Sequence, residues 1–143
     1  MRVMTIIGTR PEIIRLSEII KTLDRFTEHT LVHTGQNYDD NLYKVFFKDL
    51  KLRKPDIQLK CRSTNIQEQI SKILESTGNV MDKYKPDAIV ILGDTNSGLS
   101  AIVKKRKKIP IFHLEAGDRS FDNHVPEELN RRIIDHTSDV NLA

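Results

Sequence analysis

The chain has 143 residues, a length that suits one domain with its own hydrophobic core. Hydrophobic residues make up 38% and charged residues 30% of it, which is typical of globular rather than disordered proteins. The longest apolar run, Ala88–Leu92, has five residues, whereas a membrane span needs about 20. With no signal peptide at its start, the chain is expected to be cytoplasmic, without a membrane partner. Its one cysteine, Cys61, excludes an internal disulfide framework.

The net charge of +3 depends on one basic run, Lys104–Lys108. This run follows an apolar stretch and precedes Ile109 and Pro110, so we interpret it as the solvated last turn of a helix, where cations favour the helix dipole. The alternative is a nuclear signal or a nucleic-acid patch, but no aromatic residues are interleaved with the run. No nucleic-acid partner is therefore expected.

The first half of the chain alternates strand and helix patterns. Arg2–Ile7 predicts a buried strand, and Pro11 suits the first position of a helix that continues to Leu23. The apolar face of that helix is Ile13, Ile14, Leu16, Ile19, Ile20 and Leu23. The elements expected next are a strand at Thr30–His33, a helix at Asn41–Leu50 (with Leu42, Val45, Phe46 and Phe47) and a minor strand at Asp56–Leu59.

The second half repeats this alternation. Ala88–Leu92 is uniformly apolar, as in a strand buried on both faces of a parallel sheet. The final helix is expected to place Leu129, Ile133 and Ile134 on one face. The remaining elements expected are helices at Thr64–Tyr84, Asn96–Lys105 and Pro126–His136 and strands at Ile111–Leu114 and Val140–Ala143. The whole pattern predicts a doubly wound parallel α/β sheet of the Rossmann type.

Such sheets bind ligands beyond the carboxyl ends of their strands. Four predicted strands end in small residues followed by hydrogen-bonding or ionisable ones: Gly8–Glu12, His33–Gln36, Gly93–Asn96 and His113–Gly117. Their convergence would surround one crevice with an arginine, two histidines and two carboxylates, which suits a partly anionic ligand that needs proton transfer.

Each of these residues also has a structural interpretation. Thr9 or Asp94 can cap a helix, and Arg10 can pair with Glu12 or Asp94. His33 and His113 can be core histidines with satisfied hydrogen bonds. Glu127 and Glu128 suit the acidic first turn of any helix. Arg131 and Arg132 can lie at the surface or pair with acidic residues of the same helix. Glu115 is harder to explain structurally, because a carboxylate directly after a buried strand needs a partner.

Several other chemistries lack their motifs. There is no G-x-x-x-x-G-K-[ST] phosphate loop, no G-x-G-x-x-G after the first strand and no G-x-S-x-G. The H-x-x-x-H spacing of His29 and His33 does not suggest a metal site, because it runs into a predicted strand rather than along a helix. We therefore expect no cofactor and no metal.

Taken together, the strand-end segments resemble the non-hydrolysing UDP-N-acetylglucosamine 2-epimerase family. The matching segments are Ile7–Ile14, Thr34–Gln36, Gly93–Thr95, His113–Gly117 and Pro126–Arg132. The stretch from Glu115 to Thr137 looks most similar to a branch that acts on UDP-2-acetamido-2,6-dideoxy sugars in capsule and O-antigen synthesis.

This resemblance implies a glycosyltransferase-B-like enzyme of two domains, with residues 1–143 as its N-terminal Rossmann-like domain and the C-terminal nucleotide-binding domain absent from this chain. It also implies a homodimer and a UDP-N-acetyl-hexosamine substrate, whose C2 is inverted by elimination and re-addition of UDP. By motif match, Asp94, Glu115 and Glu127 would be the acid/base carboxylates. The substrate-binding residues would be Gly8, Thr9, Arg10, Arg15, Gln36 and Arg131.

The chain departs from the family pattern at Arg15, where many members carry lysine, and at residues 36–39, Gln-Asn-Tyr-Asp, where many bacterial members carry Gln-His-Arg. The second departure puts the allosteric site of those members in doubt. Two alternatives stay open: a truncated sugar-nucleotide-binding half-domain without activity, and the acceptor-side domain of a glycosyltransferase.

Overall fold

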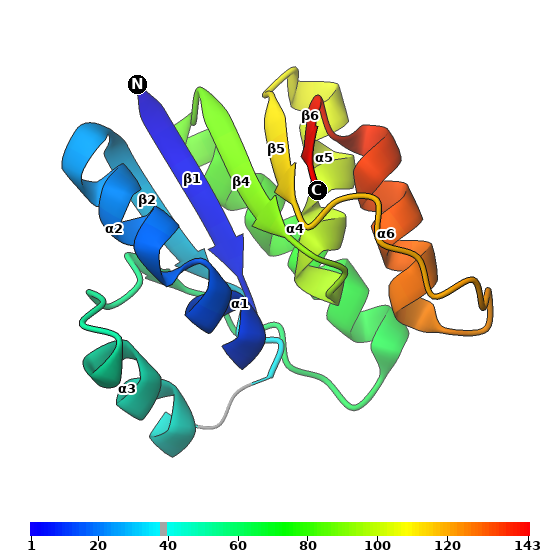
Figure 1. Ribbon diagram of the computed structural model, residues 1–143, viewed down its shortest axis with the longest axis horizontal. Coiled ribbons are helices and arrows are strands. Elements are labelled where there is room, and N and C mark those ends of the chain that lie inside the picture. Colours follow the sequence, from blue (N-terminus) through cyan, green and yellow to red (C-terminus); the bar gives the residue numbers. More distant parts are fainter. Residues whose placement is uncertain (38–39) are drawn as a thin grey trace.

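The computed structural model describes residues 1–37 and 40–143, and the side chains at 40–44 and 105–106 lie outside that description. In the described part, six parallel strands form one sheet in the order β3-β2-β1-β4-β5-β6 (Figure 1). The strands are β1 (Arg2–Ile7), β2 (Glu28–His33), β3 (Ile57–Gln58), β4 (Ala88–Leu92), β5 (Ile111–Leu114) and β6 (Val140–Leu142). The predicted doubly wound α/β class is confirmed, and the carboxyl ends of the strands meet at the lower edge of Figure 1.

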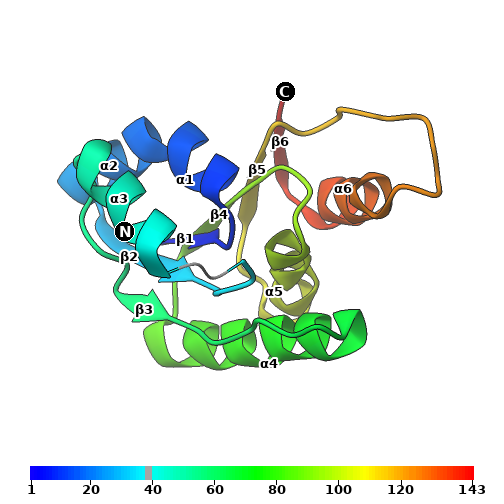
Figure 2. The ribbon, with the colours of Figure 1, turned by 90° about the horizontal axis from the view of Figure 1, so that it is seen from below.

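Helices cover both faces of the sheet (Figure 2). One face carries α1 (Arg10–Arg15), α2 (Ser17–Phe26) and α3 (Asp40–Asp49). The other carries α4 (Ile66–Tyr84), α5 (Ala101–Lys107) and α6 (Pro126–Thr137), with the 3₁₀ helix η1 (Asn96–Ser100) leading into α5. Two apolar clusters follow from this layering, one centred on Ile20 and Leu31 and the other on Ile89 and Ile134. All five residues of β4 are buried, as its uninterrupted apolar run predicted.

Two predicted helices are divided in the structure. The helix expected from Pro11 to Leu23 breaks at Leu16, which is fully buried and has φ −86° and ψ 0°. Because the break re-aims the chain, Ile14 is exposed rather than part of the apolar face. The helix expected over Asn96–Lys105 begins as η1 because Gly98 packs tightly there, and a Cβ on Gly98 would meet Ile134 Cδ1 at 2.5 Å.

The buried face of α6 differs from the prediction. Leu129 is 58% exposed, whereas Ile134, Asn130 and Glu128 are buried. The helix is turned so that Asn130 donates to the Asp94 carbonyl at 3.0 Å and Glu128 accepts from Ser120 N–H at 2.7 Å. Polar bonds, rather than apolar spacing alone, set the rotation of this helix.

The basic run is also less solvated than expected. Lys104 is buried and its ammonium pairs with Asp139, and Lys107 pairs with Asp82 on α4. The expectation of a solvated helix end is therefore wrong at Lys104, where the aliphatic stem lies inside and the charge finds a partner.

Some sequence expectations fall outside the described residues: Tyr38 and Asp39 in the departure at residues 36–39, and the side chains of Leu42, Lys105 and Arg106. Within the described helices, none is long and apolar enough to cross a membrane.

Candidate active site

The first element of the site is the loop after β1, which is organised by Glu12. This carboxylate is 1% exposed and accepts from Gly8 N–H at 2.9 Å, Thr9 N–H at 2.7 Å and Thr9 Oγ1 at 2.8 Å. Its second oxygen accepts from Thr95 Oγ1, 3.0 Å away on the loop after β4. Burial raises the pKa of the Glu12 carboxyl, and these hydrogen bonds oppose the shift. Sequence reasoning gave Glu12 no such role.

Three site residues were expected in this loop: Gly8, Thr9 and Arg10. Gly8 is needed for close packing, because a Cβ there would meet Ser97 Oγ at 2.0 Å and Thr34 Oγ1 at 2.4 Å. Thr9 is the N-cap of α1, as its structural interpretation predicted. Arg10 pairs with neither suggested carboxylate, and its guanidinium lies 5.1 Å from the Phe46 ring centroid.

Gln36, in the loop after β2, forms hydrogen bonds across the carboxyl edge of the sheet. Its side-chain carbonyl accepts from Ser97 N–H at 3.0 Å and Ser97 Oγ at 2.8 Å, and its backbone carbonyl accepts from Gln69 Nε2 at 3.3 Å. Gln69 in turn accepts from Asn96, whose side chain accepts from Asn130 at 3.0 Å. This amide chain joins the loops after β2 and β4 to α4 and α6. No motif signalled Gln69, because its partners are distant in sequence.

Asp94 and Glu115, the candidate acid/base residues after β4 and β5, meet at Arg131. The Arg131 guanidinium, 11% exposed, donates to Asp94 Oδ2 at 2.5 Å and to the Glu115 carbonyl. Arg131 thus pairs across the sheet edge rather than within its helix, and Asp94 is engaged with a charge rather than a cap. Arg132 makes the intrahelical pair, with Glu128 at 2.7 Å. The convergence of these two strand ends agrees with the expected crevice.

Glu115 is held in an uncommon backbone conformation. Its φ is +57°, in the left-handed region where few residues other than glycine occur. Its carboxylate accepts from Arg15 at 2.6 Å, so Arg15 reaches the candidate site from α1. Strained residues of this kind cluster at active sites and ligand clamps.

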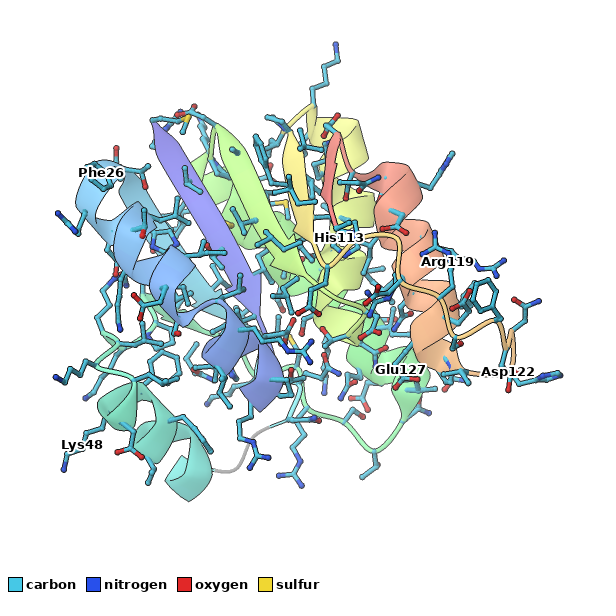
Figure 3. All side chains as sticks on the ribbon, viewed as in Figure 1. Phe26, Lys48, His113, Arg119, Asp122 and Glu127 are labelled. Carbon is cyan, nitrogen blue, oxygen red and sulfur yellow. The ribbon has the colours of Figure 1, made fainter. Side chains whose placement is uncertain are left out.

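The two glutamates that open α6 differ in their surroundings. Glu127 is exposed at the rim, as Figure 3 shows, whereas Glu128 is buried and accepts from Ser120 N–H and Oγ. The Ser120 N–H bond lowers the pKa of the Glu128 carboxyl. A cavity of about 280 Å³ opens here, and its lining includes Asp94, Arg119, Glu127 and Arg131. Three of the predicted site residues therefore share one cavity.

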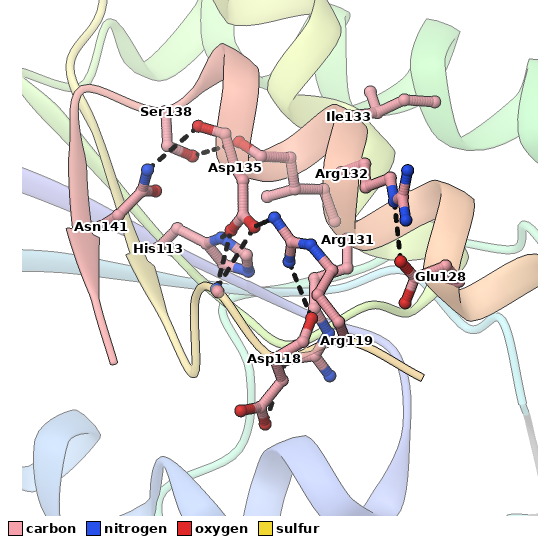
Figure 4. Close-up of polar contacts among 12 residues, drawn as sticks. His113, Asp118, Arg119, Glu128, Arg131, Arg132, Ile133, Asp135, Ser138 and Asn141 are labelled. Atoms are coloured by element: carbon pink, nitrogen blue, oxygen red, sulfur yellow. Dashed lines mark hydrogen bonds and ion pairs between the residues drawn. The ribbon is translucent and has the colours of Figure 1, made fainter. Parts of the chain in front are cut away.

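The two strand-end histidines are both buried. His33 accepts from Gly35 N–H at 3.0 Å and contacts the Gln58 side-chain amide, and burial lowers the pKa of His33 to about 4. It is the core histidine that one interpretation predicted. His113 contacts the Gly93 carbonyl, and its other ring nitrogen contacts the Asp135 carboxylate, as Figure 4 shows. Among the described side chains, no group of three His, Cys, Asp or Glu residues could hold a metal ion.

Comparisons with known proteins identify the family of the chain. A protein-family model described as UDP-N-acetylglucosamine 2-epimerase matches residues 21–143. The curated UDP-N-acetylglucosamine 2-epimerase of Methanocaldococcus jannaschii is 44% identical over 145 residues, which cover 100% of this chain and 40% of that protein. Its crystal structure in complex with UDP-GlcNAc and UDP has a TM-score of 0.92 and covers 96% of this chain and 39% of that one.

Two further structures are similar. The UDP-N-acetylglucosamine 2-epimerase of Rickettsia bellii is 56% identical, with a TM-score of 0.92, and the match covers 99% of this chain and 38% of that one. MurG from Acinetobacter baumannii is 14% identical with a TM-score of 0.66, over 98% of this chain and 39% of that one, and shares the fold alone. The chain thus spans about 40% of the length of the curated relatives it matches. The chain therefore belongs to the UDP-N-acetylglucosamine 2-epimerase family, as an N-terminal portion.

Proposed function

We propose that this chain is the N-terminal, carboxylate-bearing part of an enzyme that inverts C2 of a UDP-N-acetyl-hexosamine. The observation that carries the proposal is Arg131, which joins the Asp94 carboxylate to the Glu115 backbone at the carboxyl edge of the sheet. The Asp94 carboxylate beside Arg131 and the Glu115 carboxylate beside Arg15 suit a reaction that moves a proton while a diphosphate departs.

The proposed reaction balances as an elimination followed by an addition. A carboxylate takes the C2 proton, the C2–H electron pair forms a C1–C2 double bond, and the C1–O bond breaks with its electrons leaving on UDP. A carboxylic acid then protonates C2 on the opposite face while a diphosphate oxygen attacks C1. No proton or electron is gained or lost overall, so only the configuration at C2 changes.

Asp94, Glu115 and Glu127 are proposed as the acid/base groups, since Asp94 and Glu115 follow β4 and β5 at one sheet edge and Glu127, in the first turn of α6, lines a cavity with Asp94. Arg10, Arg15 and Arg131 are proposed to bind the substrate or the departing diphosphate, beside Gly8, Thr9 and Gln36. Arg15 and Arg131 already pair with acidic residues or a carbonyl, so an arriving diphosphate would exchange one anionic partner for another.

The remaining groups of the site are proposed to come from a C-terminal nucleotide-binding domain beyond residues 1–143. We also propose that the complete enzyme is a cytoplasmic homodimer that acts on a 2-acetamido-2,6-dideoxy sugar for capsule or O-antigen synthesis. The similarity of the stretch from Glu115 to Thr137 to that branch supports the choice of sugar.

Turnover in D₂O tests the proposal. The chain would be incubated with UDP-N-acetyl-sugars, including a UDP-2-acetamido-2,6-dideoxy sugar, and NMR would follow the C2 epimer and deuterium at C2. Asp94→Asn and Glu115→Gln should each abolish incorporation, whereas Asp87→Asn, at the opposite edge of the sheet, should retain it. Wild-type rates in either of the first two variants would refute their roles. Binding without exchange would instead favour the half-domain that binds without turnover.

A further inference from the structure

His113, fully buried at the end of β5, contacts two acceptors. Its Nε2 lies 2.7 Å from the Gly93 carbonyl oxygen, and its Nδ1 lies 2.9 Å from Asp135 Oδ1 on α6 (Figure 4). A carbonyl oxygen only accepts, so Nε2 must carry a proton. If the ring were neutral, the Nδ1 lone pair would then face a carboxylate oxygen in a buried site, which is repulsive.

A second proton, on Nδ1, turns this contact into an attraction. The approach of Asp135 is close but not aligned for a hydrogen bond, so the attraction is mainly that of a buried ion pair. The other charged group on this carboxylate is Arg119, at 2.7 Å, and Arg131 lies on the same helix but turns toward Asp94. The Asp135 carboxylate therefore contacts both the His113 ring and the Arg119 guanidinium.

The pair connects the two loops that carry the candidate carboxylates. Gly93, whose carbonyl holds the ring, directly precedes Asp94. Asp135 accepts from Gly117 N–H at 3.2 and 3.3 Å, two residues after the strained Glu115. One histidine–aspartate contact therefore joins both loops to α6.

We infer that His113 is an imidazolium held by Asp135 and that this ion pair positions the Asp94 and Glu115 loops relative to each other. Both residues are positioning residues, because they act through their neighbours. The protonation of the His113 ring and the attachment of the two loops to α6 are inferred from geometry alone. Only the effect on catalysis rests on the proposed function.

His29 provides an internal control within the same protein. Its Nδ1 also meets a carboxylate, Asp24 at 2.6 Å, but its Nε2 faces the Thr5 hydroxyl at 2.8 Å, which can donate. A neutral ring satisfies both contacts of His29, and burial lowers its pKa. The two histidines differ chiefly in whether the group opposite Nε2 can donate a proton.

The test is ring ¹⁵N NMR of the full chain at pH 7.5. We expect two protonated ring nitrogens in His113 and one in His29. A singly protonated His113 in the wild-type protein would overturn the inference, and this measurement requires no variant to fold.

Asp135→Asn supplies the second measurement. It should leave His113 singly protonated and speed amide exchange at Gly117 at least about tenfold, while Asp82→Asn, which breaks an exposed pair with Lys107, should change neither. Unchanged exchange at Gly117 in the folded variant would refute the anchoring role. If the wild type turns over substrate, Asp135→Asn should lower kcat more than it changes KM. A wild-type chain with an imidazolium His113 but no ligand binding would refute the proposed function and leave this inference intact.

Discussion

The two edges of the sheet carry charged residues in different ways. At the carboxyl edge, Arg131 pairs with Asp94 across 37 positions of the chain with its guanidinium 11% exposed, and Glu12 is fully enclosed. At the opposite edge, the pair of Arg2 and Asp87 is 44% exposed on both sides. The Arg131 pair is thus largely buried and the Arg2 pair is solvated, although the buried Lys104 also finds a partner, Asp139, beside the start of β5.

This difference matters because, of the two hollows compared, the one at the second edge is larger and has more cationic residues in its lining. A groove of about 620 Å³ there has a lining that includes Arg2, Lys85, Lys107 and Lys108, against about 280 Å³ at the candidate site. Exposed ion pairs contribute about 0–1 kcal/mol, whereas buried charges must be held by specific partners. Volume and net charge would therefore favour the opposite edge, whereas the long-range polar bonds of Glu12, Gln36 and Arg131 favour the carboxyl edge as the candidate site.

The largest effect is expected from Gly8→Ala at the carboxyl edge. The added Cβ would meet Ser97 Oγ at 2.0 Å and Thr34 Oγ1 at 2.4 Å, so the bonded hydroxyls must move. We expect a loss of about 3 kcal/mol in the free energy of unfolding, measured by denaturant titration. The matched control is Gly78→Ala in α4, where a Cβ would meet Val103 at 3.3 Å and the change should stay within about 1 kcal/mol. Equal losses would contradict the close packing of this loop.

Low pH should lower the free energy of unfolding through His33, which also lies at the carboxyl edge. Its pKa falls from 6.5 to about 4 on folding, so below pH 6.5 the unfolded chain binds a proton that the folded chain does not. Its stabilising contribution is present above pH 6.5 and is lost as the pH falls toward 4. We expect a loss of about 3 kcal/mol over this window relative to His33→Asn, whose side chain can still accept from Gly35. Parallel stability curves for the two proteins would exclude a neutral buried His33.

Arginine removal compares the two edges directly. Arg131→Met leaves the Asp94 carboxylate without its cation and should cost about 2 kcal/mol, less than a fully buried pair because Asp94 is partly exposed. Arg2→Met breaks a solvated pair and should cost less than about 0.5 kcal/mol. Thermal unfolding of both variants checks the difference, and similar shifts in Tm would show that burial does not separate the edges.

The smallest change in the free energy of unfolding, measured by denaturant titration near pH 4, is expected from Glu12→Gln. The glutamine oxygen can accept from Gly8 and Thr9, and its amide can donate to the rotatable Thr95 hydroxyl. Because burial raises the pKa of Glu12, the folded chain keeps its proton longer than the unfolded chain as the pH rises above 4.5. The wild type should therefore lose stability relative to the variant with rising pH. A relative gain would mean that the ionised carboxylate is the favoured form.

The sequence predicted the sheet well because periodicity and strand ends are local signals. β4 and β5 have their predicted bounds, and the four strand-end segments lie at one edge. Leu129 and Lys104 were misplaced because their exposure depends on Asn130, Glu128 and Asp139, which bond across the fold. Long-range partners of this kind, like those of Glu12 and His113, leave no spacing pattern in the chain.

The central claim is that the carboxyl edge binds a nucleotide sugar. Amide NMR of the chain titrated with UDP-N-acetylglucosamine tests it most directly. The account predicts saturable shifts at Thr9, Asp94, Glu115 and Arg131, with Lys85 and Lys108 at the opposite edge unchanged. Shifts confined to the opposite edge would contradict the claim. So would the absence of shifts in this chain at a ligand concentration that saturates a full-length relative.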